Sequence, residues 1–239
     1  MKPPEFDVLI TAEEAWPAFE RAVLSAQSEI VAGFRIFDMT TRLRSPEALE
    51  IGTDWFDLLA YVIGRGVTLT LIVSDFDPVM ATPLHEAAWR TVRQGTALAE
   101  LADAPAGQIE VRAALHSAQA GLVPWLGFLP AVLKRKWSAL RDVKGMRLSR
   151  QAVGLQKDRL PDLHTVTHHQ KLAVIDNQTL YVGGLDMNER RYDSQTHDLP
   201  ARQTWSDVQI IVQGPAARDA RRHLLSFERV TDGKCPVQG

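Results

Sequence analysis

The residues with the clearest chemical potential lie in a short segment near position 170. His169, Lys171 and Asp176 have a His-x-Lys-x4-Asp spacing, and Gly183 and Gly184 follow after six further residues. From the residue frequencies of this chain, about 0.015 copies of the three-residue pattern are expected by chance. An imidazole and an ammonium two residues apart suit chemistry on a phosphate, because one can attack phosphorus while the other binds its oxygen atoms.

The segment 164–176 is expected to be a β-strand, and this gives the motif a geometry. Side chains alternate between the two faces of a strand, so His169 and Lys171 would share one face and Asp176 would point to the other. Asp176 therefore suits a structural role, accepting hydrogen bonds from a turn or the backbone. The two glycines would let the backbone approach the same pocket closely and would offer N–H groups to the phosphate.

The motif and the sequence that follows it resemble the phospholipase D superfamily. The similarity continues through 183–197, 204–208 and 214–219, and it is strongest between His168 and Phe227. In that family one motif histidine attacks phosphorus and forms a phosphohistidine. The histidine of a second motif protonates the leaving alcohol and then activates water or another alcohol.

The resemblance implies roles for residues of this sequence. By similarity, His169 is the nucleophile, Lys171 holds the phosphate, and Asp207 orients the imidazole as a carboxylate behind a histidine does. Asp176 completes the motif and is counted with this catalytic group. For Arg191 a solvated ion pair is the simpler alternative to a substrate contact. By the resemblance, Asp186 occupies a position where many relatives carry Asn. The residues expected to bind the substrate are Gly183, Gly184, Asp186 and Arg191.

The motif occurs once. No second copy begins at the other histidines considered, which are His85, His116, His164, His197 and His223. A complete site in the family needs two motifs that face each other, so this chain is expected to supply half of one. A homodimer across a two-fold axis would provide the second copy. Alternatively, the chain is the N-terminal half of a longer protein, which its similarity to two-motif phospholipases D favours.

Helical and strand patterns alternate along the chain. This alternation predicts an α/β fold with a mixed β-sheet flanked by helices, in a single domain over 1–239, and the resemblance implies the same phospholipase D-like architecture. The expected strands are 30–37, 67–73, 109–115, 164–176, 179–183 and 207–213, and the expected helices begin near Thr11, Asp54, Thr82 and Pro215.

The stretch 117–163 is expected to be an irregular insertion. Its apolar segment 120–133 contains Pro124 and Pro130, which argue against one regular helix, and a basic run at 134–136 follows. The segment could lie on a membrane surface, with its tryptophans at the interface and its basic residues on lipid phosphates. A loop packed on the core is favoured, because three basic residues add only a few kcal/mol of attraction to lipid.

The composition is that of an ordinary globular protein. Of the 239 residues 45% are hydrophobic and the formal net charge is −2, which indicates neither a disordered chain nor a strongly basic nucleic-acid binder. A single cysteine, Cys235, argues against a disulfide-stapled secreted module. Asp75, Asp77 and His85 have no convincing metal-ligand spacing, and the family chemistry needs no metal, so no cofactor is expected.

These observations predict a phospholipase D-type phosphodiesterase or transphosphatidylase that acts on phospholipid head groups. Because no signal peptide or membrane span is recognisable, we expect a cytoplasmic protein with transient contact to a membrane surface. No nucleic-acid partner is expected. Two alternatives stay open: a nuclease of the same superfamily, and a module that is inactive until it meets a second motif.

Overall fold

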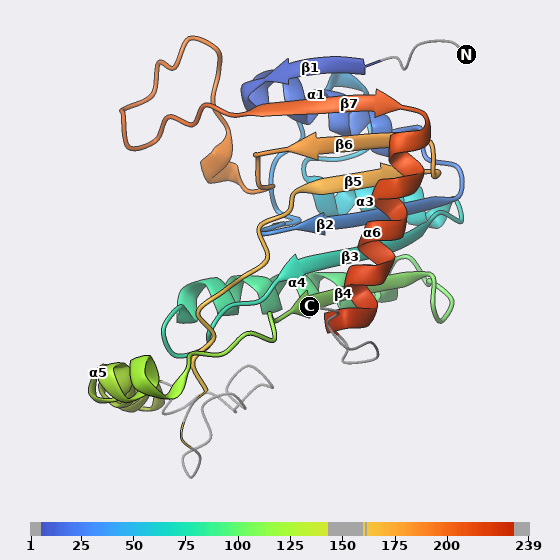
Figure 1. Cartoon of the computed structure of the whole chain (residues 1–239). Coiled ribbons are helices and arrows are strands. Elements are labelled where there is room, and N and C mark those ends of the chain that lie inside the picture. The colour runs from blue at the N-terminus through green and yellow to red at the C-terminus, as the bar shows by residue number, and fades with distance from the viewer. Residues whose placement is uncertain (1–5, 143–159, 161, 232–239) are drawn as a thin grey trace.

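The computed structural model describes residues 6–142, 160 and 162–231, and its centre is one seven-stranded sheet (Figure 1). The strand order is β1-β7-β6-β5-β2-β3-β4, with parallel pairing among β2, β3 and β4 and antiparallel pairing elsewhere. This confirms the predicted mixed sheet. The strands are β1 (Phe6–Ile10), β2 (Glu29–Phe34), β3 (Thr68–Ser74), β4 (Ile109–Ala114), β5 (Leu172–Ile175), β6 (Thr179–Gly183) and β7 (Val208–Gln213).

Helices cover both faces of this sheet and enclose two apolar layers. The helices are α1 (Thr11–Leu24), α2 (Pro46–Leu49), α3 (Trp55–Gly64), α4 (Thr82–Leu101), α5 (Leu122–Asp142) and α6 (Pro215–Thr231), with a 3-10 turn η2 (Glu189–Arg191). On the face of α1, α3 and α4, Phe19 is buried and stacks on Tyr181 with 4.2 Å between ring centroids. On the other face, Leu224 of α6 packs on Val174 of β5 (Figure 1). Burial on both faces explains why the central strands are rich in aliphatic residues.

The strand directions bring several loops to one edge of the sheet. β1, β2, β3, β4 and β6 run one way, and β5 and β7 run the other. The chain that leaves β2, β3 and β6 therefore meets the chain that enters β5 and β7. Strand β5 is shorter than predicted, since only Leu172–Ile175 pairs with its neighbours. His169 and Lys171 lie just before it, at this shared edge.

The segment after β4 differs from the prediction. The sequence predicts an irregular stretch, but residues 122–142 form one helix, α5, which continues through Pro130. Pro124 lies in the first turn, where the missing N–H has no helical partner, so only Pro130 interrupts the hydrogen bonding. The expectation that these prolines exclude one helix is therefore wrong. The rest of the predicted insertion, 143–159 and 161, lies outside the described residues.

Helix α5 is attached to the body of the protein along one side. Val132 packs with Val79 and Leu163, and Arg135 donates a hydrogen bond to the Met80 carbonyl at 2.8 Å. Several large apolar side chains of the helix are instead exposed, namely Leu122, Val123, Leu126, Phe128 and Trp137. The favoured expectation of a core-packed loop does not hold for them. Among the described residues, no helix combines the length and the apolar character needed to cross a bilayer.

Candidate active site

The imidazole of His169 and the ammonium of Lys171 lie together at the shared edge of the sheet. Lys171 Nζ is 3.2 Å from His169 Nδ1 and donates a hydrogen bond to the His169 carbonyl, also at 3.2 Å. The lysine is buried, whereas the histidine is exposed. This geometry leaves the imidazole accessible, with a fixed positive charge beside it.

Asp186, two residues after Gly184, lies among three cations that surround this pair. Its buried carboxylate lies 3.9 Å from Lys171, 3.6 Å from Arg35 and 3.8 Å from Arg191. The backbone N–H of Ile36 fixes the carboxylate by donating to Oδ1 at 3.0 Å. These three distances to Asp186 are longer than a hydrogen bond. The cations therefore have N–H groups that can still donate hydrogen bonds to a bound anion such as phosphate.

A loop interaction holds Arg191 in place. Its guanidinium lies over the Trp205 ring at 3.4 Å from the centroid, and the Trp205 backbone N–H donates to Asp193 at 2.5 Å. Within the described structure, the buried Nη1 of Arg191 has no hydrogen-bond partner. A bound anion would supply the missing acceptor.

Arg35 is the site residue that the sequence reasoning missed. It follows β2 directly, and its guanidinium lies over the Phe76 ring, 5.3 Å from the centroid. A signal was present, because Arg35 is the only charged residue in the predicted strand 30–37. In open α/β sheets, ligands bind at the carboxyl ends of strands, which is where this arginine lies.

The electrostatics favour a neutral imidazole next to an anion site. Burial lowers the pKa of His169, and the charges of Lys171 and Arg35 lower it further. The ring is therefore neutral at pH 7, the state in which a nitrogen can attack phosphorus. Burial also lowers the pKa of Lys171, while Asp186 acts in the opposite direction. Arg35, Lys171 and Arg191 carry three positive charges, and Asp186 and Asp207 carry two negative ones. The remaining single positive charge matches the single negative charge of a phosphodiester.

Asp207 lies near the site but does not hold the imidazole. Its carboxylate accepts the N–H of Val208 at 2.9 Å, and its charge acts on Lys171. In the described part of the chain no hydrogen bond joins it to His169. The predicted orienting role therefore lacks geometric support. Asp207 instead packs against Gly184, where an added Cβ would lie 2.0 Å from its Oδ1.

The paired glycines serve the sheet. The N–H of Gly183 donates to the Lys171 carbonyl at 3.2 Å, and that of Gly184 to the Val208 carbonyl at 3.2 Å. Both amides are thus already bonded, so the predicted contacts with phosphate are not available to them. A Cβ on Gly183 would lie 1.5 Å from Gln209 Oε1, and this close approach is why glycine stands there.

Asp176 lies at the opposite end of β5 from His169. Its carboxylate accepts backbone N–H groups from Gln27, Ser28 and Glu29 at 2.8, 2.8 and 3.0 Å. These contacts tie the turn after β5 to the chain entering β2. The geometry supports the structural role predicted from strand alternation, and it separates Asp176 from the catalytic group in which the resemblance placed it.

His168, next to the motif histidine, packs into a different environment. Its ring meets Phe227 edge-on at 4.1 Å between centroids and lies 4.8 Å from the ring of His116. Its carbonyl accepts a hydrogen bond from Ser74 Oγ at 2.7 Å, while its buried Nε2 has no partner in the described structure. Burial, with a smaller effect of His116, lowers the pKa of His168 to about 4.

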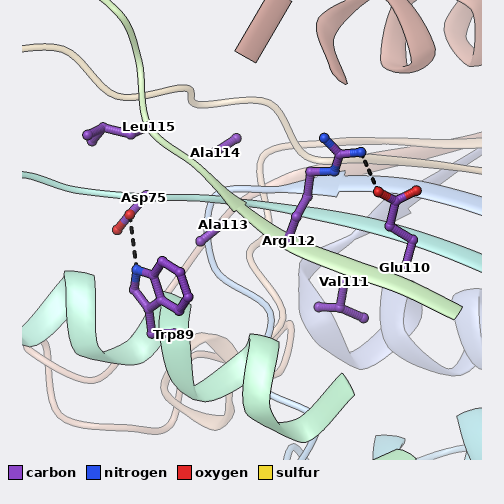
Figure 2. Close-up of a pocket in the computed structure, with 8 residues that line it drawn as sticks. All are labelled: Asp75, Trp89, Glu110, Val111, Arg112, Ala113, Ala114 and Leu115. Carbon is purple, nitrogen blue, oxygen red and sulfur yellow. Dashed lines mark hydrogen bonds and ion pairs between the residues drawn. The ribbon is translucent and has the colours of Figure 1, made fainter. Parts of the chain in front are cut away.

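A pocket of about 540 Å³ beside the edge strand β4 is separate from this site. Figure 2 shows its lining: Asp75, Trp89, Glu110, Val111, Arg112, Ala113, Ala114 and Leu115. Asp75 accepts hydrogen bonds from Trp89 Nε1 at 3.1 Å and pairs with His85 Nδ1 at 2.7 Å. Asp77 instead caps the turn at Val79. Among the described residues no cluster of three or more His, Cys, Asp or Glu is arranged to hold a metal.

Comparison with known proteins gives partial sequence matches and a match of fold. No family model matches the chain. Phospholipase D delta of Arabidopsis thaliana is 32% identical over 93 residues, covering 26% of this chain and 10% of that protein. Phospholipase D zeta 1 of the same plant is 28% identical over 95 residues, covering 25% and 9%. The matches thus span about a tenth of these relatives.

Among solved structures, Nuc from Salmonella typhimurium, a phospholipase D family member, matches with a TM-score of 0.50. The two sequences are 12% identical, and the match covers 95% of each chain. The mixed sheet with its flanking helices is therefore the fold of the phospholipase D superfamily. Fold and sequence matches together relate this chain to that superfamily of phosphodiesterases.

Proposed function

We propose that this chain supplies one half of a phospholipase D-type active site, in which His169 attacks the phosphorus of a phospholipid. The observation that supports this most directly is the convergence of Arg35, Lys171 and Arg191 beside one exposed, neutral imidazole. Cations in a fixed arrangement stabilise charge that develops on the non-bridging oxygens during displacement at phosphorus.

In the proposed reaction, a nitrogen of the His169 imidazole bonds to phosphorus while the bond between phosphorus and the head-group oxygen breaks. The leaving oxygen takes a proton from an acid on its own side. Water then attacks phosphorus and gives a proton to the same group, which is now a base; the P–N bond breaks, and phosphatidic acid and the free imidazole are released. An alcohol in place of water would give a new phosphatidyl ester, which is transphosphatidylation.

The same histidine cannot act on both sides of phosphorus, so the proposal requires a second histidine as the general acid. We propose that a second motif supplies it, from another copy of this chain or from a second domain. An exposed His169 at the edge of the sheet is accessible to such a partner. Activity that depends on a dimer would rise more steeply than linearly with protein concentration.

The phospholipid substrate is supported by the sequence matches, because both relatives are named phospholipases D. The test is release of head group and phosphatidic acid from phosphatidylcholine vesicles. His169→Ala should reduce turnover by several orders of magnitude, since it removes the group that forms the covalent intermediate. A control is Arg218→Ala, which removes an exposed side chain of α6 and should leave the rate unchanged.

Two results would contradict the proposal. A folded His169→Ala protein with near-wild-type turnover would exclude the nucleophile, provided that circular dichroism shows the fold intact. Cleavage of plasmid DNA with no hydrolysis of phosphatidylcholine would exclude the phospholipid substrate and favour a nuclease.

A further inference from the structure

The outward face of α5 is the largest feature that the proposed site leaves unexplained. Val123, Leu126 and Trp137 are 81%, 53% and 60% exposed. Together with the exposed Pro130 and Lys134, they follow a spacing of three, four, four and three residues, which aligns them along one side of a helix. The stripe lies away from Val132, which attaches the helix to the body.

Every charged residue of α5 before Asp142 is basic. No Asp or Glu occurs between Glu110 and Asp142, although the chain holds 29 acidic residues and has a net charge of −2. Lys134 and Arg135 are both exposed, next to Trp137. An apolar helix face bordered by basic residues and tryptophan is the pattern of a helix that lies in the surface of an anionic bilayer.

The position of α5 relates this face to the candidate active site. The helix follows β4, whose carboxyl end lies at the same edge of the sheet as Arg35 after β2 and His169 before β5. Figure 1 shows α5 beyond this edge, on the side toward which β3 points. A surface that receives α5 would therefore face the end of the molecule that carries the reacting residues.

We propose that α5 is a membrane-docking helix that inserts its outward apolar stripe into the surface of an anionic phospholipid bilayer. A protein partner with a matching apolar groove is less favoured, because the stripe carries only basic charge and ends in tryptophan. The docking explains why the described residues leave this apolar face uncovered. It deepens the proposed function by presenting lipid to the site, but it can be measured without turnover.

The test is co-sedimentation with vesicles of phosphatidylcholine, alone or mixed with phosphatidylglycerol. Binding should be stronger to the mixed vesicles and should weaken as salt is added. Leu126→Glu should lower the partition coefficient about tenfold or more, because it places a charge in the inserted stripe. The control is Leu101→Glu, the same change at a leucine of α4 that is 66% exposed, and it should bind as the wild type does.

A second measurement locates the contact. Bromine-labelled lipid quenches tryptophans that enter the bilayer surface, so the wild-type fluorescence should fall on binding. Trp137→Phe should lose most of this quenching while it still binds. If Leu126→Glu binds as well as the control, or if Trp137→Phe leaves quenching unchanged, the proposal is wrong. It is also wrong if Leu126→Glu dissociates an oligomer of the protein without weakening vesicle binding.

The outcome is separable from that of the proposed function. His169→Ala should bind vesicles as the wild type does, since His169 is no part of the stripe. Vesicle binding without phospholipid hydrolysis would leave the docking intact and contradict the function. Hydrolysis of phospholipid dispersed in detergent, without binding to anionic vesicles, would support the proposed function and contradict the docking.

Discussion

Acidification from pH 7 to pH 5 is expected to destabilise the folded protein through His168. The ring packs edge-on against Phe227, and its buried Nε2 has no hydrogen-bond partner in the described structure. A proton added there would lack both water and a counter-charge. Burial, with a smaller effect of His116, therefore lowers the pKa to about 4, whereas an unfolded histidine titrates near 6.5.

The sign follows from which state binds the proton. Below about pH 6.5, His168 binds a proton in the unfolded chain but not in the folded one. The free energy of unfolding therefore decreases as the pH is lowered and levels off near pH 4. The two pKa values give a loss of about 2 kcal/mol between pH 7 and pH 5. Burial would raise the pKa of Asp176, but its hydrogen bonds hold it below the ordinary value. The stability contributed by that carboxylate is therefore lost only below about pH 4.

The assay is urea unfolding, followed by circular dichroism at pH 7 and pH 5, of the wild type and His168→Phe. Phenylalanine keeps an aromatic ring against Phe227 and cannot titrate, so the variant should lose about 2 kcal/mol less than the wild type. The control Tyr61→Phe, a change at an exposed ring of α3, should lose as much as the wild type. Equal losses for the wild type and His168→Phe would refute the reasoning.

Three further predictions concern the site and its frame. Gly184→Ala should cost about 1–3 kcal/mol in urea unfolding, because its Cβ would enter a neighbouring carboxylate, whereas Gly64→Ala meets nothing within 4 Å and serves as control. Asp176→Ala should lower the free energy of unfolding by about 2 kcal/mol, because the backbone N–H groups that donate to its carboxylate lose their acceptor. An unchanged urea midpoint would contradict this. Arg35→Gln removes a charge that lowers the pKa of His169, so the acid limb of the kcat/KM profile should move to higher pH, not lower.

The part of the site that could be predicted from the sequence is the part encoded locally. His169 and Lys171 are two residues apart, and a strand-like backbone alone places them on one side. Arg35 could not be paired with them in the same way, because its contact with Asp186 depends on the order of strands in the sheet. The neighbouring Ile36 bonds to Asp186 across 150 positions of sequence.

Side-chain roles were harder to predict than positions. Asp207 lies at the start of the predicted strand 207–213, yet its carboxylate accepts the Val208 N–H and makes no hydrogen bond to His169 in the described structure. The glycines follow the motif as predicted, but the Gly183 amide is bonded to the Lys171 carbonyl and the Gly184 amide to the Val208 carbonyl. For α5 the sequence showed two prolines and could not show that Pro124 falls in the first helical turn, where proline is tolerated.

The order of strands also determines when the protein can complete its fold. β2, β3 and β4 all come from the first 114 residues, whereas β5, which pairs with β2, begins at Leu172. During synthesis, the hydrogen-bonding edge of β2 that pairs with β5 therefore remains open after β4 is complete, until more than fifty further residues have emerged. An open strand edge of this kind promotes association between nascent chains. Arg35 lies at the end of β2, whereas Lys171 and Arg191 are synthesised much later. The cation cluster is therefore among the last contacts to form as the chain folds.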